Sequence, residues 1–131
     1  MCDYFHLAYP DVIYHSDGSG LRLPIGLAIK YGKLKSGRGI PDLFIAEPKG
    51  AYAGLYLEIK REDEKVFKPD GTLYSAKKTN PKTKEVTDHL VEQAIMLDRL
   101  KHKGYATYFG IGFKMCADLI DDYMKLELGE K

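Results

Sequence analysis

The amino-acid sequence predicts an α/β fold in which a small mixed β-sheet is flanked by helices. Two short apolar runs, Leu43–Ala46 and Ala53–Arg61, are separated by a turn, and we expect them to pair as a hairpin. A helical segment, Val86–Lys103, then separates this hairpin from a third strand, Tyr105–Ile111. Because that helix is long enough to serve as a crossover, the third strand can join the sheet in parallel. Alternating elements of this kind are typical of a layered α/β domain.

Two helices and a turn are expected before the hairpin. Residues 3–14 favour a short helix that Pro10 interrupts, and Ser16–Gly20 has the composition of a flexible turn. A second helix is expected to begin near Pro24, because proline is tolerated at the first turn of a helix. The helical spacing of the apolar residues that follow continues until Ser36-Gly37, which end the helix.

The segment after the hairpin is predicted to be a long exposed loop, followed by two more helices around the third strand. Residues 64–87 are rich in lysine, threonine, proline, asparagine and serine, with a small ribbon expected around Gly71. The helix Val86–Lys103 presents one apolar face, and Gly104 stands where a C-terminal cap belongs. The final helix is expected over Met115–Leu126. The residues that mark the inner faces of these two helices are Leu90, Ala94, Leu97 and Leu100 in the first, and Leu119, Ile120 and Tyr123 in the second.

Length and composition indicate one globular domain over residues 1–131. A hydrophobic fraction of 44% and a charged fraction of 30% are ordinary for a folded domain and argue against disorder of the whole chain. No apolar run approaches the ~20 residues that span a bilayer, and the first residues lack the features of a signal peptide, so a cytoplasmic location is expected. Cys2 and Cys116 form no C-x-x-C pair, which predicts free thiols and no zinc site.

The net charge of +1 conceals basic central segments. Residues 65–84 hold six lysines against one acid, Asp70, and residues 22–49 hold six basic residues against Asp42 and Glu47. The compensating acids gather mostly at the C-terminus. This pattern suits a face that binds a polyanion, although lysines that only solvate loops would leave the same pattern.

A candidate catalytic cluster lies in the predicted hairpin. Because side chains alternate along a strand, Leu57 and Ile59 can face the core while Glu58 and Lys60 share the opposite face. An ordinary solvated ion pair would have the same spacing. However, pairing of the two strands also brings Asp42 beside Glu58. Two adjacent carboxylates repel unless a divalent cation or a proton intervenes, and Mg²⁺ accepts one or two carboxylates completed by water and substrate phosphate.

These residues resemble the PD-(D/E)xK nuclease superfamily, and more closely its VRR-Nuc branch. The resemblance covers roughly residues 13–124. Its most specific pieces are Gly39-Ile40-Pro41-Asp42-Leu43 and Glu58-Ile59-Lys60. It is supported by His15-Ser16-Asp17-Gly18, by Gly54 through Leu57, by Gln93, and by Leu100 with Gly104-Tyr105.

The resemblance implies a restriction-endonuclease-like fold and a metal-dependent phosphodiesterase that acts on DNA. It implies that Asp42, Glu58 and the backbone carbonyl of Ile59 bind Mg²⁺ or Mn²⁺, that Lys60 is the catalytic lysine, and that Gln93 lies near the metal. Small stand-alone members of this branch, as in phages and bacteria, resemble homodimeric resolvases of four-way (Holliday) junctions. Larger relatives carry the module within DNA-repair nucleases. A branched DNA substrate and a homodimer are therefore expected, and a phage or bacterial origin suits the compact architecture.

The sequence departs from this pattern in two places. Ser16-Asp17-Gly18 replaces the Asn-Gly that usually follows the histidine, so we assign no catalytic role to that turn. The connection between the Glu-x-Lys strand and Gln93 is usually short, whereas here it is the lysine-rich insertion at 64–87.

DNA contacts are expected from basic residues before Asp42 and within the insertion. Such contacts hold the phosphate backbone and set position rather than sequence. Tyr74 is a candidate for stacking on a base, and His15 is a candidate phosphate contact or metal ligand, or a packed histidine. Two alternatives remain open, namely a non-catalytic DNA-binding module and a nuclease acting on other DNA or RNA structures. The predicted DNA-contacting residues are Lys30, Lys33, Lys35, Arg38, Lys65, Lys68, Lys77 and Lys78.

Overall fold

The computed structural model describes residues 2–16, 41–75 and 77–127 of the chain. The predicted turn beyond Ser16 and the predicted helix after Pro24 lie outside these ranges. The elements in chain order are α1 (Cys2–Ala8), β1 (Tyr14–Ser16), β2 (Leu43–Ile45), β3 (Leu55–Lys60), β4 (Lys77–Thr79), β5 (Val86–Asp88), α3 (His89–His102), β6 (Ala106–Ile111) and α4 (Gly112–Met124).

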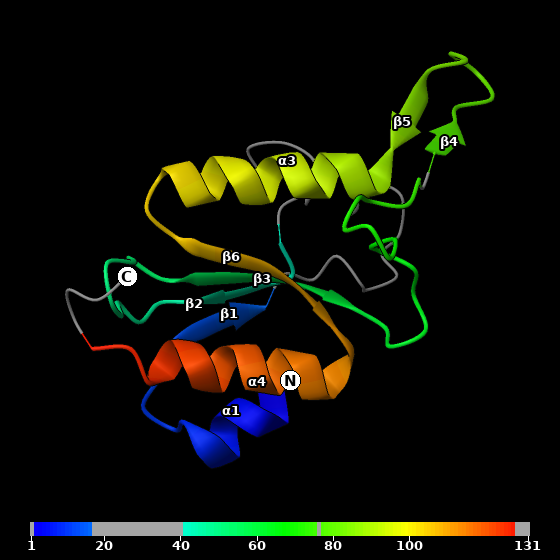
Figure 1. The fold of residues 1–131 in the computed structure, drawn as a ribbon. Helices are drawn as coiled ribbons and strands as arrows, with labels where there is room; N and C mark the ends of the chain where they lie inside the picture. The colour runs from blue at the N-terminus through cyan, green and yellow to red at the C-terminus, as the bar shows by residue number, and fades with distance from the viewer. Residues whose placement is uncertain (1, 17–40, 76, 128–131) are drawn as a thin grey trace.

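Four strands form a mixed sheet in the order β1-β2-β3-β6. β1 with β2 and β2 with β3 are antiparallel, whereas β3 and β6 are parallel. Helix α3 covers one face of the sheet as the crossover between β3 and β6, and α1 and α4 cover the other face (Figure 1). The predicted α/β fold, a small mixed sheet flanked by helices, is confirmed. Within the described ranges, no helix has the length and apolar character needed to cross a bilayer.

The main hydrophobic core lies between the sheet and the helices α1 and α4. Strands β2 and β3 point alternate side chains into it, and Leu43, Ile45, Leu55 and Leu57 are each at most 1% exposed. Helix α4 approaches the sheet closely at Gly110, where a Cβ atom would clash with the Sγ atom of Cys116. Both residues are buried, so small side chains on both sides are what permit this packing. The buried members of the core are Phe5, Leu43, Ile45, Leu55, Leu57, Ala106, Cys116, Ile120 and Tyr123.

A smaller core lies on the other face, beneath α3. It contains Val66, Leu90, Leu97 and Phe109. Val66 is 1% exposed although it belongs to the insertion that the sequence predicts to be an exposed loop. The first part of the insertion is therefore packed against α3. The sequence does not reveal this packing, because a short apolar pair flanked by lysines carries no periodic signal. The ribbon expected around Gly71 is present as a single bridge between Phe67 and Leu73.

The N-terminal prediction of a helix over residues 3–14 is wrong in its second half. Helix α1 ends at Ala8, two residues before Pro10, and Tyr14–Ser16 form the edge strand β1. This strand pairs with β2, with His15 opposite Phe44. A three-residue strand is too short for its own alternation to reveal it, and its partner is distant in the sequence.

Two helix boundaries also differ from expectation. Helix α3 begins at His89 rather than Val86, because Val86–Asp88 pair with β4 and the Asp88 side chain caps the helix by accepting from the Val91 amide at 3.3 Å. Helix α4 begins at Gly112 rather than Met115, directly after β6. The predicted glycine at the end of α3 is confirmed, since Gly104 has φ +101° and its amide donates to the Lys101 carbonyl at 3.1 Å.

Helix α1 is held against α4 by a shared carboxylate. The hydroxyl groups of Tyr4 and Tyr9 both donate to Oδ1 of Asp121, the second at 2.7 Å. These hydrogen bonds lower the pKa of Asp121 below its usual value and, in the case of Tyr4, raise the pKa of the phenol. The charged form of Asp121 therefore stabilises the folded chain.

This arrangement predicts a pH-dependent contribution to stability. Because its folded pKa is depressed, Asp121 stabilises the protein above the unfolded pKa of about 4, and the contribution is lost as pH falls through the folded pKa. Asp121→Asn is expected to lower the free energy of unfolding by about 1–2 kcal/mol at pH 7, with the difference from wild type shrinking below about pH 4. Urea unfolding measured between pH 2 and 7 checks this.

The matched control is Asp118→Asn, one turn earlier on α4, where the carboxylate forms only an exposed ion pair with Lys114 at 2.8 Å. A surface pair of that kind contributes at most about 1 kcal/mol. Equal pH profiles for the two variants would contradict the role given to Asp121.

Candidate active site

Glu58 and Lys60 lie near the C-terminal end of β3, on the sheet face covered by α3. Their neighbours Leu57 and Ile59 face the main core, as the alternation along a strand requires. Glu58 is 3% exposed and Lys60 is 9% exposed. Burial at this level excludes an ordinary solvated ion pair. It is unusual for both residue types, and buried charged groups in proteins are paired or bind metals.

Asp42 lies at the entrance to β2, beside Glu58. Leu43 pairs with Leu57, so continuing the antiparallel register by one residue brings Asp42 opposite Glu58. The side chain of Asp42 fixes this position, because its Oδ2 atom accepts from the Ile59 amide at 2.9 Å. The juxtaposition expected from the sequence is therefore present. An ionised carboxylate can accept more contacts than the one that the Ile59 amide makes.

Gln93 connects helix α3 to this pair of carboxylates. Its Nε2 atom donates to Oε1 of Glu58 at 2.9 Å, and the side chain is 5% exposed. The reverse amide orientation would set two oxygen atoms against each other, so the Glu58 carboxylate decides the orientation. The Oε1 atom of Gln93 is buried and has no hydrogen-bond partner within the described ranges. Spacing alone suggests a residue at the edge of the apolar face, whereas Gln93 is buried against β3.

Two residues that sequence reasoning missed lie next to this cluster. His89 stands one turn before Gln93 on α3, and the Nε2 atoms of the two residues are 3.2 Å apart. If Gln93 donates to His89 as well, the imidazole carries its proton on Nδ1. Glu64 follows Lys60 in the turn after β3, with Oε2 at 3.9 Å from the lysine Nζ. The i,i+4 spacing of His89 and Gln93 is the sequence signal that could have identified His89. No sequence pattern marks Glu64.

The other predicted residues that the structure describes lie on the insertion and on the edge strand β1. Lys65, Lys68 and Lys77 are exposed on the insertion, and Lys78 lies in β4 opposite Thr87. Tyr74 is half-buried, with the Lys68 ammonium 5.9 Å from its ring centroid. His15 is exposed on the edge strand β1. The remaining predicted DNA contacts, Lys30, Lys33, Lys35 and Arg38, lie outside the described residues.

The donor set at this cluster fits a hard divalent cation such as Mg²⁺. The cluster offers oxygen atoms, which Mg²⁺ and Mn²⁺ prefer as ligands. They belong to the carboxylates of Asp42 and Glu58, the backbone carbonyl of Ile59 and the buried side-chain amide of Gln93. Each can bind the cation or accept a hydrogen bond from metal-bound water. No group of three histidine, cysteine or acidic side chains suited to a metal occurs among the described residues. A cation here would therefore keep several waters, as Mg²⁺ commonly does.

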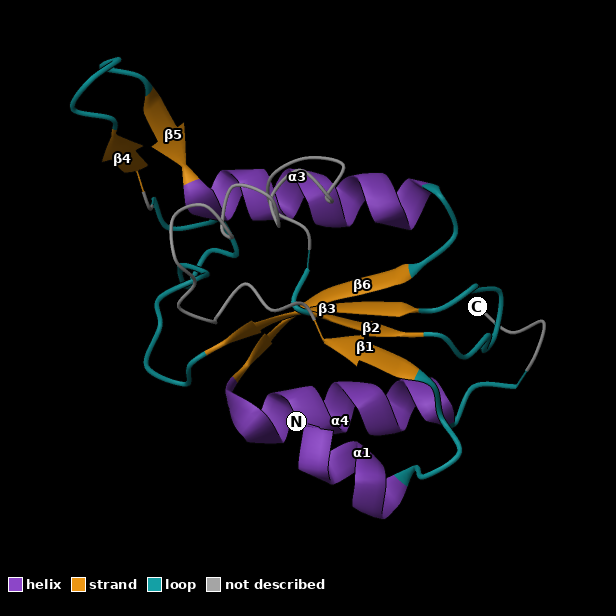
Figure 2. Ribbon diagram, turned by 180° about the vertical axis from the view of Figure 1, so that it is seen from behind, coloured by secondary structure: helices purple, strands orange, loops and turns teal. Residues whose placement is uncertain are grey.

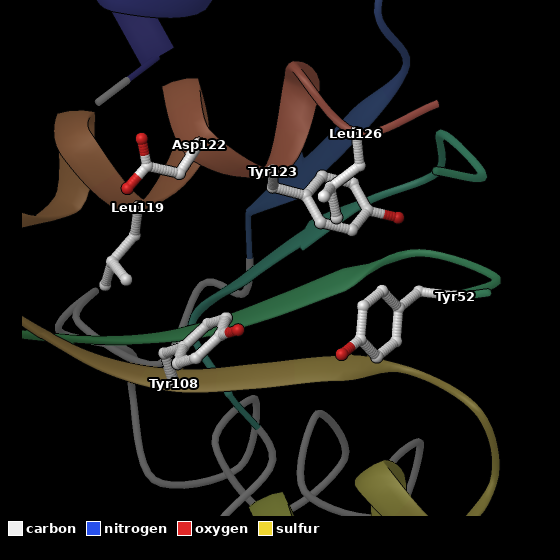
Figure 3. A pocket seen from close by; sticks show the side chains of 6 residues that line it. All are labelled: Tyr52, Tyr108, Leu119, Asp122, Tyr123 and Leu126. Carbon is white, nitrogen blue, oxygen red and sulfur yellow. The ribbon is translucent and has the colours of Figure 1, made fainter. Parts of the chain in front are cut away.

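A pocket on the opposite face of the sheet contains none of the predicted site residues. It has a volume of about 240 Å³ and lies between β6, the turn before β3 and the end of α4 (Figure 3). Three tyrosines and Asp122 surround it, and burial raises the pKa of Tyr123 to about 12. Its lining residues are Tyr52, Tyr108, Leu119, Asp122, Tyr123 and Leu126.

Comparison with solved structures identifies a protein of similar architecture. A chain described as a VRR_NUC domain protein superimposes with a TM-score of 0.58 at 24% sequence identity, covering 89% of this chain and 73% of that one. The two proteins share a fold. The predicted restriction-endonuclease-like class is thereby confirmed for the architecture. No family model matches the sequence, and no curated protein sequence matches it significantly.

The Glu58–Gln93 hydrogen bond can be tested by a double-mutant cycle. Replacing Gln93 by methionine removes a donor from a buried carboxylate, so Gln93→Met is expected to lower the free energy of unfolding by about 1–3 kcal/mol. Glu58→Met and the double variant complete the cycle, measured by urea unfolding. A coupling energy of roughly 0.5–3 kcal/mol is expected between the two sites, and strictly additive costs would show that the contact contributes nothing.

Proposed function

We propose that this protein is a metal-dependent nuclease that hydrolyses phosphodiester bonds in DNA. The observation that carries the proposal is that β3 presents buried Glu58 and Lys60 on one face, with Asp42 bonded to the Ile59 amide between them and Gln93 bound to Glu58. A protein that only binds DNA has no need to bury a lysine beside two carboxylates, since that arrangement costs solvation energy. The shared fold with a VRR_NUC domain protein supports the proposal.

Each residue of the cluster has a distinct proposed role. Asp42, Glu58 and the Ile59 carbonyl would hold Mg²⁺ or Mn²⁺, which when bound supplies Lewis-acid stabilisation of phosphate charge and an activated water. The hydrogen bond from Gln93 to Oε1 of Glu58 fixes the orientation of the Glu58 carboxylate. The amide oxygen of Gln93 can accept a hydrogen bond from a water molecule at the site. Lys60, held within the sheet, offsets charge on the phosphate and orients the attacking water.

Branched DNA, such as a four-way junction, is the proposed substrate, and a homodimer is the proposed assembly. Resolution of a symmetric junction requires two cuts on symmetric strands, and a two-fold dimer presents two equivalent sites in the matching arrangement. This part of the proposal rests on the sequence resemblance.

Metal binding can be tested separately from cleavage. Asp42 and Glu58 lie side by side on neighbouring strands, so bound Mg²⁺ or Mn²⁺ is expected to raise the free energy of unfolding of wild type by about RT ln(1 + [L]/Kd), roughly 2.7 kcal/mol at a hundred times Kd, and to raise the melting temperature with it. Glu58→Gln should remove most of this increase. The control Glu62→Gln alters an exposed acid in the following turn and should retain it. Equal metal responses in both variants would place the cation elsewhere.

Cleavage is tested on a labelled four-way junction and on a linear duplex of matched sequence, each with Mg²⁺, Mn²⁺ or EDTA. Wild type is expected to make metal-dependent, paired symmetric cuts in the junction. Lys60→Ala should lower the rate by about 10²-fold or more, the range for groups that stabilise or protonate a transition state. The control Lys114→Ala removes an exposed lysine from α4 and should leave the rate unchanged.

Each alternative has its own outcome in this assay. Equal cutting of both substrates would retain the nuclease and discard the junction preference. Binding without cutting under any metal, by a protein confirmed to be folded, would favour a DNA-binding module.

A further inference from the structure

The insertion contains a second, smaller sheet that projects from the body of the protein. Strands β4 and β5 form an antiparallel hairpin, in which Lys77 pairs with Asp88 and Thr79 with Val86. The hairpin extends from the N-terminal end of α3 and points away from the four-stranded sheet (Figures 1 and 2). Every residue from 79 to 86 is exposed. The sequence predicts only an exposed loop here, because three-residue strands are too short to show alternation.

The tip of this hairpin has a defined conformation. Asn80 organises it, since its side-chain oxygen accepts from the Lys82 amide at 2.9 Å and its carbonyl accepts from the Lys84 amide at 2.7 Å. Lys84 adopts a left-handed conformation with φ +58°. The two tip lysines are therefore presented by an ordered turn, and not by an unstructured chain.

The base of the hairpin is joined directly to the candidate active site. Asp88, the last residue of β5, caps α3 and also accepts from the Ser75 hydroxyl at 3.1 Å. His89 follows it and lies 3.2 Å from Gln93, which in turn contacts Glu58 at 2.9 Å. The first turns of α3 therefore fix the orientation of the hairpin relative to the Glu58 carboxylate.

Charge and side-chain type along the hairpin fit nucleic acid. The hairpin, residues 77–88, holds four lysines, Lys77, Lys78, Lys82 and Lys84, against two acids, Glu85 near the tip and Asp88 at the base, where it caps α3. Val86 is 59% exposed, and its cross-strand partner Thr79 is exposed beside it. An exposed β-branched pair on a basic ribbon is the combination that can contact thymine methyl groups while lysines hold the flanking phosphates.

We propose that β4–β5 is a duplex-binding arm that lies in the major groove of double-stranded DNA next to the scissile phosphate. The major groove, about 12 Å wide, admits a two-stranded ribbon, whereas the minor groove of about 6 Å does not. The substrate class is thereby narrowed to DNA that carries a duplex arm on the α3 side of the cut. This inference rests on the proposed nuclease function.

The length of the arm sets the length of duplex that it requires. From Asp88 to Lys82 the chain runs six residues, which at about 3.3 Å per residue sets an upper limit of roughly 20 Å on the reach of the arm, because the residues of the tip turn are not fully extended. With about 3.4 Å per base pair along the helix axis, this distance corresponds to about six base pairs. Cleavage by wild type should therefore fall as the duplex arm is shortened below about six base pairs.

The test variant is Lys82→Ala combined with Lys84→Asn, because asparagine tolerates the left-handed conformation at position 84. The matched control is Lys114→Ala combined with Lys125→Ala, which removes one lysine from α4 and one from its C-cap, on the opposite side of the sheet. Equal unfolding midpoints for the three proteins establish that each variant is folded.

Binding to a linear duplex is measured in EDTA, as a function of salt concentration. Loss of two phosphate contacts should reduce the slope of log K against log salt by about 1.8 in the test variant and leave it unchanged in the control. Affinity for the matched single strand should not change in either. Wild type should also protect guanine N7 atoms from methylation by dimethyl sulfate, at positions near six base pairs from the cut, and the test variant should not.

The outcomes separate this inference from the proposed function. If wild type cuts DNA but the test variant keeps the same salt slope, N7 protection and arm-length requirement, the duplex-binding arm is wrong and the nuclease stands. If wild type neither binds nor cuts any DNA, both are wrong. Loss of affinity for single strand and duplex alike would make the hairpin a general anion contact and overturn its placement in the groove.

Discussion

The pairing of β2 with β3 is the constraint on which the candidate site depends. One register brings Asp42 opposite Glu58, and the bond from the Ile59 amide to the Asp42 carboxylate holds that register at its end. A slip by one residue would turn Glu58 and Lys60 toward the main core and bring Leu57 and Ile59 out of it. Burial of the apolar strand residues therefore stabilises the fold and positions the carboxylates at the same time.

The two faces of the sheet differ in the residues that they bury. The face toward α1 and α4 is packed with apolar side chains at almost no exposure, and it holds most of the buried apolar residues in the described part of the chain. The face toward α3 has a smaller apolar core around Val66 and Phe109. The rest of that face holds Glu58, Lys60 and Gln93, which are polar groups that burial alone would disfavour. Stability on one face thus supports a costly polar arrangement on the other.

Helix α3 links this arrangement to the insertion. Its first turn carries the Asp88 cap, His89 and then Gln93, so one rigid element contacts both the hairpin β4–β5 and the carboxylate of Glu58. The first part of the insertion packs beneath the same helix through Val66. The insertion, which the sequence predicts to be an exposed loop, therefore helps to position the candidate site.

The sequence by itself determined the layered α/β fold, the hairpin, the crossover helix and the shared face of Glu58 and Lys60. Each of these follows from local periodicity or from spacing within a few residues, which a linear pattern records directly. It also placed Asp42 beside Glu58, because a short turn leaves one natural pairing for two adjacent strands. The residues predicted to contact DNA before Asp42 lie outside the described ranges, and their role stays a prediction.

Only the tertiary structure decided the edge strand β1, the β4–β5 hairpin, the burial of Val66 and Gln93, and the place of His89 and Glu64 beside the cluster. Strands of three residues are stabilised by partners rather than by their own pattern. Likewise, a single buried polar residue on a helix is recognised only from what lies across from it. Short elements and buried polar contacts depend on residues far away in the chain, and for that reason sequence periodicity does not reveal them.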